Sequence, residues 1–198
     1  MAAGGGREVA LGCHERLVLP GTRLGLPEVT LGFVPGAGGT QRLPRLIGVE
    51  AALDVIVTGR LLNATEALTL GIVDAIVEGD LIEAAATRIQ ELVDSKLPFR
   101  RASTLNAKLI EAQGQPELFD AYRTKIAKRA RGFDAPYACI ACVQTALTVP
   151  YAEAAKKERE VFSQLVTSDQ SSAQRHVFIS AREVAKITAV PKDTPSRP

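Results

Sequence analysis

The sequence predicts an α/β protein with a helical C-terminal extension, because its composition changes along the chain. Eleven of the 16 glycines lie within residues 1–48, and the short alternating stretches between them are typical of strands and turns. Residues 49–187 are instead rich in Ala, Leu, Glu, Lys and Arg, with apolar side chains at helical spacing. We expect three parts: a core over 1–95, a helical extension over 96–187, and a tail or linker with three prolines over 188–198.

Length and composition disfavour several classes of protein. The chain has 198 residues, 46% of them hydrophobic, which is enough for one domain with a buried core. The 24 Lys and Arg residues nearly balance the 22 Asp and Glu residues, and only 5% of residues are aromatic, so a nucleic-acid-binding surface is disfavoured. Apolar runs fall far short of the roughly 20 residues of a membrane helix. Three cysteines are too few for a disulfide framework, so we expect a reducing, cytoplasmic location.

The glycine-rich part is expected to hold short elements. A helical turn or two is predicted over residues 7–11. A strand over 14–19 is predicted because Val and Leu cluster ahead of a Pro-Gly turn, and a second extended piece follows over 22–25. The run 35–40 reads as an irregular glycine-rich loop that leads into a helix.

Stronger helix signals follow this loop. Apolar residues at helical spacing predict a helix over 49–58. Asn63 is a good N-cap with Glu66 three residues later, and Gly71 stands where a C-terminal glycine belongs. The β-branched run 72–77 predicts a strand.

The remainder is expected to be helical. Asp80 begins a helix that runs to about Ser95. Four more helices are predicted, at about 116–131, 134–147, 150–167 and 169–187.

A first candidate site is the glycine run that precedes Glu8. Glycines before a helical turn let backbone amides approach a ligand closely, and amides at a helix N-terminus stabilise an anion or a developing oxyanion. The Glu8 carboxylate could act on whatever is held there. The alternative is a flexible N-terminal tail with a glutamate that favours the helix dipole.

A second candidate is Glu28, which follows an extended Leu-Pro pair and precedes the loop 35–40. This loop matches neither a phosphate-binding Walker motif nor a dinucleotide fingerprint, since Gln41 stands in place of the third glycine. The alternative is a simple turn before a helix. If Glu8 and Glu28 meet in space, they could divide the roles of general base and general acid.

Other reactive residues receive structural interpretations. Cys139 and Cys142 form a C-x-x-C match with no second pair or nearby His, so we expect two buried thiols and no metal site. His14 and His176 are assigned no catalytic role. Three basic clusters are expected on solvated helix faces, with phosphate binding as the alternative: Arg100-Arg101, Lys128-Arg129 and Lys156-Lys157.

The order of these motifs along the chain also resembles that of a known protein family. The chain resembles the enoyl-CoA hydratase/isomerase (crotonase) superfamily over about its first 95 residues, at 4–13, 24–32, 35–45, 58–60, 64–68 and 70–74. Residues 150–160 and 173–183 are similar to the hydratase half of bifunctional fatty-acid oxidation enzymes. In that subgroup a Pro-rich connector like 190–198 leads into a 3-hydroxyacyl-CoA dehydrogenase domain. The composition favours a bacterial, cytoplasmic origin, with a peroxisomal one as the alternative.

The resemblance implies roles for four residues in the addition of water to a 2-enoyl-CoA thioester. Glu8 matches the general base that activates water, and Glu28 matches the acid that protonates the α-carbon. Gly5 matches an oxyanion-hole amide, and Gly36 matches a loop amide that helps hold the water. No metal or redox cofactor is implied, since coenzyme A is part of the substrate. Both glutamates are present, which favours hydration over isomerisation. Arg7 departs from the family, where this position is generally apolar or small.

The resemblance also implies a truncated crotonase (ClpP-like) fold, in which 1–95 is the C-terminal part of the core. Family members make several strand and helix units before the position of Gly4, and these supply the other oxyanion amide and much of the coenzyme A surface. We therefore expect impaired activity. The competing hypothesis is a non-catalytic fragment that forms oligomers or packs against a complementing crotonase or dehydrogenase segment.

Overall fold

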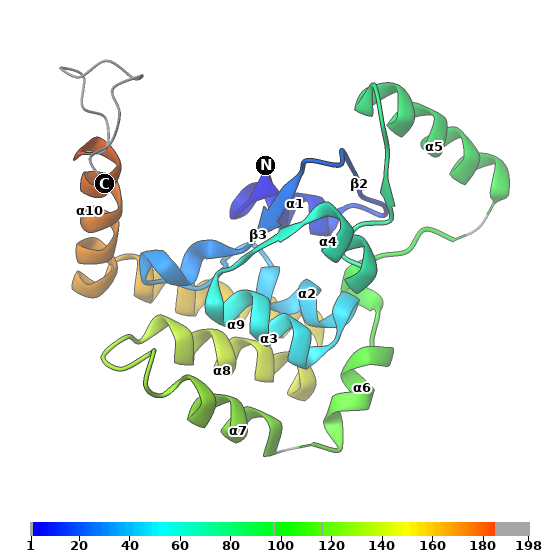
Figure 1. Cartoon of the computed structure of the whole chain (residues 1–198). Helices are drawn as coiled ribbons and strands as arrows, with labels where there is room; N and C mark the ends of the chain where they lie inside the picture. Colours follow the sequence, from blue (N-terminus) through cyan, green and yellow to red (C-terminus); the bar gives the residue numbers. More distant parts are fainter. Residues whose placement is uncertain (1, 97, 116, 185–198) are drawn as a thin grey trace.

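The computed structural model describes residues 2–96, 98–115 and 117–184, which form a mostly helical body with two small sheets (Figure 1). Within these ranges no helix is both long and apolar enough to cross a lipid bilayer. The predicted tail 188–198 lies outside the described residues. The division of the chain at residues 95 and 96 stays a prediction.

The larger sheet joins strands that are far apart in the sequence. It has the order β1 (Ala2–Ala3), β3 (Arg23–Gly25) and β4 (Leu61–Asn63), with β1 parallel and β4 antiparallel to β3. The predicted extended piece over 22–25 is confirmed as β3. Neither β1 nor β4 was expected, because each is short and is defined by its pairing with β3 rather than by local sequence.

The smaller sheet is shorter than the sequence predicts. It pairs β2 (Leu17–Val18) in parallel with β5 (Ala75–Ile76), so the strands predicted over 14–19 and 72–77 are reduced to two residues each. Beyond these two-residue strands, hydrogen bonds that involve side chains connect the two segments. The backbone N–H of Arg16 donates to the Asp74 carboxylate at 2.9 Å, and Arg16 Nε donates to the carbonyl oxygen of Ile72 at 2.6 Å.

The first 70 residues contain several short helices. They are α1 (Gly5–Gly12), the 3₁₀ helix η1 (Pro27–Leu31), α2 (Gly39–Ile47), α3 (Val49–Thr58) and α4 (Ala64–Leu70). The helices predicted over 7–11 and 49–58 are confirmed. The Asn63 side chain caps α4 by accepting from the N–H of Glu66, and Gly71 ends it at a positive φ of 81°.

The described residues of the C-terminal part form helices joined by short non-helical segments. Its elements are α5 (Leu81–Ser95), η2 (Ala102–Thr104), α6 (Ala107–Gln113), α7 (Glu117–Ile126), α8 (Ala135–Thr148), α9 (Tyr151–Val166) and α10 (Asp169–Val184). Asp80 caps α5 as expected. Helix α7 ends five residues before its predicted limit of 131, and η2 and α6 were not predicted.

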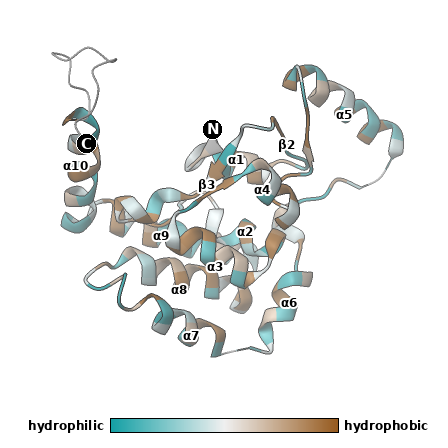
Figure 2. Ribbon diagram, in the orientation of Figure 1, coloured by the Kyte–Doolittle hydropathy of each residue, from teal (hydrophilic) through white to brown (hydrophobic). Residues whose placement is uncertain are grey.

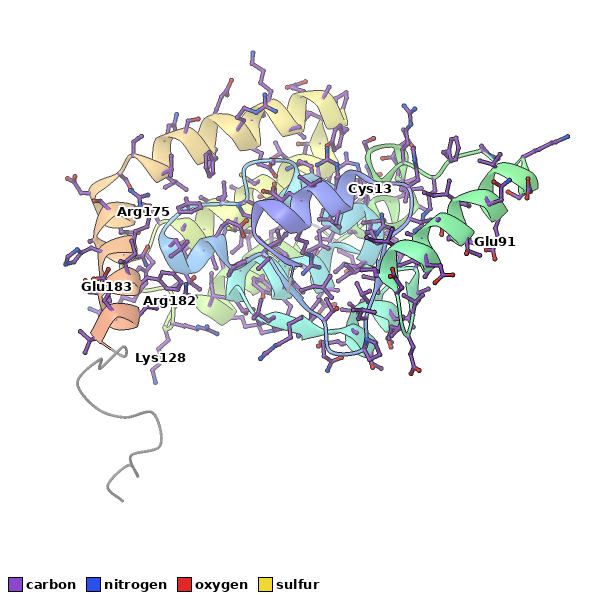
Figure 3. All side chains as sticks on the ribbon, turned by 90° about the horizontal axis from the view of Figure 1, so that it is seen from above. Cys13, Glu91, Lys128, Arg175, Arg182 and Glu183 are labelled. Carbon is purple, nitrogen blue, oxygen red and sulfur yellow. The ribbon has the colours of Figure 1, made fainter. Side chains whose placement is uncertain are left out.

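The core lies where α2, α3 and α8 pack together. Apolar residues, brown in Figure 2, recur along these three helices, and Leu43, Leu53, Ile56, Ile140 and Val143 are fully buried between them. Burying each such side chain contributes roughly 1.5–3 kcal/mol. By contrast, α5 and α10 stand at opposite ends of the molecule, which Figure 3 shows through Glu91 on α5 and Arg182 on α10.

Candidate active site

Glu8 lies in the first turn of α1, and its side chain is only 4% exposed. The turn begins at Gly4, whose φ of 59° favours glycine. The Gly4 carbonyl oxygen accepts hydrogen bonds from the N–H groups of Arg7 and Glu8 at 2.9 and 3.1 Å, and the Gly4 N–H donates to Gly25 of β3 at 3.1 Å. The sheet therefore fixes the start of the helix that carries Glu8.

The glycine-rich segment predicted as a loop over 35–40, called the loop 35–40 below, binds the Glu8 carboxylate, although its last two residues already belong to α2. Oε1 of Glu8 accepts hydrogen bonds from the N–H groups of Ala37 at 2.8 Å and Gly39 at 2.7 Å. A Cβ on Gly39 would lie 2.8 Å from this oxygen, so the close approach requires glycine. Oε2 of Glu8 has no hydrogen-bond partner among the described residues, which leaves it free for a reacting molecule.

A third carboxylate, which the sequence did not point to, holds the other side of this loop. Glu158 of α9 is 1% exposed. Its Oε1 accepts from the N–H of Gly38 at 2.5 Å, and its Oε2 accepts from both the N–H of Thr40, at 2.8 Å, and the Thr40 hydroxyl. Burial raises the pKa of Glu158 to about 7, although these hydrogen bonds act in the opposite direction. One signal was available in the sequence: Glu158 lies four residues from both Ala154 and Phe162, which is the spacing of one helix face.

Glu28 lies in η1, which begins at Pro27, so the Leu-Pro pair before it is not extended throughout as the sequence suggested. It is 6% exposed, and its Oε2 is buried with no hydrogen-bond partner in the described part of the chain. The pKa of Glu28 is raised to about 7, mainly by burial and also by the charges of Glu8 and Glu158, while its own backbone amide and the charge of Arg7 act in the opposite direction. Glu28 thus holds a proton at neutral pH far more readily than an exposed glutamate.

The structure brings Glu8 and Glu28 together at the start of α1. Their charges interact, and a Cβ on Gly4 would lie 3.3 Å from Oε1 of Glu28. Gly5 is exposed at the first position of α1, and its N–H has no acceptor among the described residues. Gly36 packs against α9, where an added Cβ would lie 2.5 Å from the Phe162 ring. The roles predicted for Gly5 and Gly36 stay predictions, since the amides that reach Glu8 are those of Ala37 and Gly39.

Arg7 introduces a buried cation beside this pair. Its side chain is fully buried, and none of its three guanidinium nitrogens has a hydrogen-bond partner in the described ranges. Burial lowers the pKa of Arg7 to about 10, and the charge of Glu28 opposes that change. An unpaired buried cation is costly, so Arg7 favours an acceptor or an anion close to it.

Cys139 and Cys142 are buried free thiols, and the described residues hold no group of side chains suited to a metal ion. The His14 ring stacks on the Phe99 ring, with 4.7 Å between their centroids.

The prediction that the three basic clusters lie on helix faces is only partly right. Arg100-Arg101 lies outside any helix and Lys128-Arg129 lies in the turn after α7, whereas Lys156-Lys157 lies on α9. Lys157 forms an exposed ion pair with Glu153 at 2.9 Å, as a solvated helix face would.

This arrangement suits acid-base chemistry on a small organic group. Glu8 has one oxygen held by two amides and one available oxygen, while Glu28 has a raised pKa because of burial. Two carboxylates in such different environments can take up one proton and deliver another in the same reaction. The N-terminal amides of α1 can stabilise negative charge that develops nearby.

Comparisons with known proteins agree with this chemistry. Residues 1–121 match the family model described as enoyl-CoA hydratase/isomerase. The peroxisomal bifunctional enzyme of Danio rerio is 45% identical over 188 residues, which cover 95% of this chain and 26% of that protein. The fatty acid oxidation complex subunit alpha of Shewanella halifaxensis (strain HAW-EB4) is 39% identical over 192 residues, 93% of this chain and 27% of that protein. The chain therefore spans about a quarter of the length of these relatives, which include peroxisomal and bacterial proteins.

A solved structure shares the fold. An enoyl-CoA hydratase from Mycobacterium avium subsp. paratuberculosis K-10 superposes with a TM-score of 0.59 at 21% identity. The match covers 90% of this chain and 60% of that one.

Proposed function

The chain belongs to the enoyl-CoA hydratase/isomerase family and has the crotonase fold, and from this premise we propose that it is the hydratase module of a fatty acid β-oxidation enzyme. Its reaction would add water across the 2,3 double bond of a 2-enoyl-CoA thioester. One observation carries the proposal: Glu8 and Glu28 converge in space, one held through an oxygen by two loop amides and the other with its pKa raised to about 7. Relatives named as peroxisomal bifunctional enzyme and fatty acid oxidation complex subunit support the pathway.

Glu8 is the proposed general base. Because Ala37 and Gly39 bind its Oε1, the free Oε2 can accept a proton from water while the water oxygen forms a bond to C3. The π electrons of the double bond then move toward the thioester carbonyl. We assign stabilisation of the resulting oxyanion to the N–H of Gly5, which is the first residue of α1. The role of Gly36 is to keep the loop closely packed, so that its neighbouring amides reach Glu8.

Glu28 is the proposed general acid. Its raised pKa keeps a proton available near neutral pH, and this proton goes to C2 as the enolate collapses. Water thus supplies the hydroxyl group at C3, Glu28 supplies hydrogen to C2, and Glu8 retains the proton taken from water. Both glutamates return to their starting states by exchange with solvent. The reaction is redox-neutral, so the proposal includes no cofactor beyond the coenzyme A portion of the substrate.

A second candidate, packing against a partner chain or forming a homo-oligomer, has its own support. A cavity of about 320 Å³ between α1, β2 and α5 is lined by Arg7, Leu17 and Leu81. Arg7 has no acceptor there within the described residues, and α5 leaves Ile82 and Ile89 largely exposed. A complementing crotonase or dehydrogenase segment, or a second copy of the chain, would cover such surfaces.

The three free thiols support a reducing compartment such as the cytoplasm.

Hydration of crotonyl-CoA by the purified chain tests the catalytic proposal. The loss of 2-enoyl absorbance should be measurable with the wild-type chain and should fall by about 10²–10⁴ in Glu28→Gln. Glu160→Gln is the matched control, because Glu160 lies on α9 with 58% of its side chain exposed. A folded wild-type chain without turnover, or a Glu28→Gln variant as active as wild type, would contradict the proposal.

A further inference from the structure

Helix α9 lies directly on the glycine-rich loop 35–40. Tyr151, Glu158 and Phe162 are spaced by seven and four residues, so they share one stripe of the helix. A Cβ on Gly36 would lie 2.5 Å from the Phe162 ring, and one on Gly38 would lie 3.0 Å from the Tyr151 hydroxyl. The stripe therefore covers the loop closely, with Glu158 at its centre.

Four successive loop amides alternate between two carboxylates. The N–H groups of Ala37 and Gly39 donate to Glu8, and those of Gly38 and Thr40 donate to Glu158. Because the four N–H groups belong to consecutive residues, holding one pair restricts the backbone that carries the other pair. The two carboxylates hold the loop between them, although Glu158 is 118 residues from Thr40 in the sequence.

The Glu158 carboxylate is itself fixed by a directed chain of hydrogen bonds. Gln41 Nε2 donates to the Thr40 hydroxyl oxygen at 2.9 Å and also to the carbonyl oxygen of Cys142 on α8 at 2.8 Å. Thr40 therefore directs its own hydroxyl hydrogen to Glu158. All three groups that face Glu158 from the loop are donors, so the site accepts an ionised carboxylate and has no place for a donor.

We propose that Glu158 is a positioning residue for Glu8: by holding the N–H groups of Gly38 and Thr40, it keeps those of Ala37 and Gly39 directed at the Glu8 carboxylate. This inference rests on the proposed function for the role of Glu8, but the positioning is a property of the loop alone. Glu158 touches no reacting atom in this account. It sets the orientation of the base, and α9 thereby becomes part of the catalytic architecture.

Hydrogen exchange of the four loop amides, followed by NMR, tests the positioning without any substrate. In Glu158→Gln, which keeps the side-chain volume but places donor hydrogens against donors, all four amides should exchange at least about 10-fold faster than in wild type. The decisive amides are Ala37 and Gly39, which do not contact Glu158. Glu160→Gln, on the same helix and exposed, should leave all four rates unchanged.

Two results would overturn the proposal. In one, Gly38 and Thr40 exchange faster while Ala37 and Gly39 keep their wild-type rates, which would mean that Glu158 anchors only its own amides. In the other, none of the four rates changes. Glu158→Asp guards against a misfolded Gln variant: it keeps the charge with a shorter reach, so its four rates should fall between those of wild type and Glu158→Gln.

Turnover gives a second readout. If the chain hydrates crotonyl-CoA, Glu158→Gln should lower kcat by about 10-fold or more with little change in KM, and Glu158→Asp should restore part of the loss. A merely structural role would instead lower the folded fraction and leave the KM and the kcat per folded molecule unchanged. If the wild-type chain shows no turnover, the proposed function fails, and the exchange rates alone decide the role of Glu158.

Discussion

The two sides of the loop 35–40 are built from very different parts of the chain. On the α1 side, Glu8 lies 31 residues from Gly39 and sits beside Glu28 within one glycine-rich segment. On the α9 side, Glu158 comes from the helical extension and lies 120 residues from Gly38. Both carboxylates bind two amides of the same loop, yet only Glu8 keeps an oxygen without a partner among the described residues. The comparison shows that carboxylates from distant parts of the chain hold alternate amides of one segment, and in our proposals Glu8 carries the chemistry while Glu158 supports it.

The largest effect is expected on the α1 side. Glu8→Gln should lower the kcat for crotonyl-CoA hydration by about 10²–10⁴, because the loss of a general base typically costs that much. The exchange rates of Gly38 and Thr40 should stay close to wild type, since Glu158 still binds them. Steady-state kinetics and NMR exchange check both points. An unchanged kcat in Glu8→Gln would contradict the assignment of Glu8 as the general base.

Glu28→Gln tests the electrostatics of the same side through the stability of the chain. Folding raises the pKa of Glu28 from its ordinary 4.5 to about 7, so the folded chain binds this proton more tightly than the unfolded chain. The resulting stabilisation is fully present below pH 4.5 and is lost as the pH rises through 7. Gln cannot ionise, so the Glu28→Gln variant does not lose this stabilisation. The free energy of unfolding of the variant minus that of wild type should therefore increase by about 3 kcal/mol between pH 4.5 and pH 8.

Urea unfolding of both chains across this pH range measures that difference. The comparison cancels the pH dependence that the two chains share, and it counts the charge interaction between Glu28 and Glu158 with the contribution of Glu28. A difference that stays constant with pH would show that Glu28 ionises normally in the folded chain.

Gly36→Ala tests the packing on the α9 side. The added methyl group would meet the Phe162 ring at 2.5 Å, so either α9 or the loop must move. We expect a loss of about 1–3 kcal/mol in the free energy of unfolding. Gly21→Ala is the control, because its Cβ would contact no other group within 4 Å. Equal stability of the two variants in chemical unfolding would show that α9 does not press on the loop.

The smallest effect is expected for Thr40→Val, which removes one hydroxyl donor from Glu158 and keeps the backbone N–H. The free energy of unfolding should fall by about 1 kcal/mol, and Gly38 should keep its protection from exchange. Calorimetry and NMR exchange check the two statements. If all four amides exchanged as fast in Thr40→Val as in Glu158→Gln, the Thr40 hydroxyl rather than the backbone N–H groups would be what holds Glu158 on the loop.

Local signals predicted much of this fold. The helix Val49–Thr58 and the Asn63 cap follow from apolar spacing and capping chemistry, which act within a few residues. Strands β1 and β4 could not be predicted in this way, because pairing with β3 defines them across the chain. The 3₁₀ turn that carries Glu28 was missed for a related reason: its packing against α3 and α10 is a tertiary property.

The site was predicted in the same uneven way. Glu8 and Glu28 were named from the sequence because glycines and a resemblance marked their segments. Glu158 was not, because a glutamate in a charged helix is typical of a solvated face, and only its spacing of four residues from Ala154 distinguished it. The N–H groups of Ala37 and Gly39 on Glu8 were not predicted, because they depend on the tertiary path of the backbone, and the water-holding role that the resemblance implies for Gly36 stays a prediction.

The most direct test of this account is a double-mutant cycle on crotonyl-CoA hydration with wild type, Glu8→Gln, Glu158→Gln and the double variant. If Glu158 acts through Glu8, the wild-type chain turns over, each single variant is slower, and the double variant is no slower than Glu8→Gln. A double variant whose loss equals the product of the two single losses would contradict the account, as would a folded wild-type chain that hydrates no substrate.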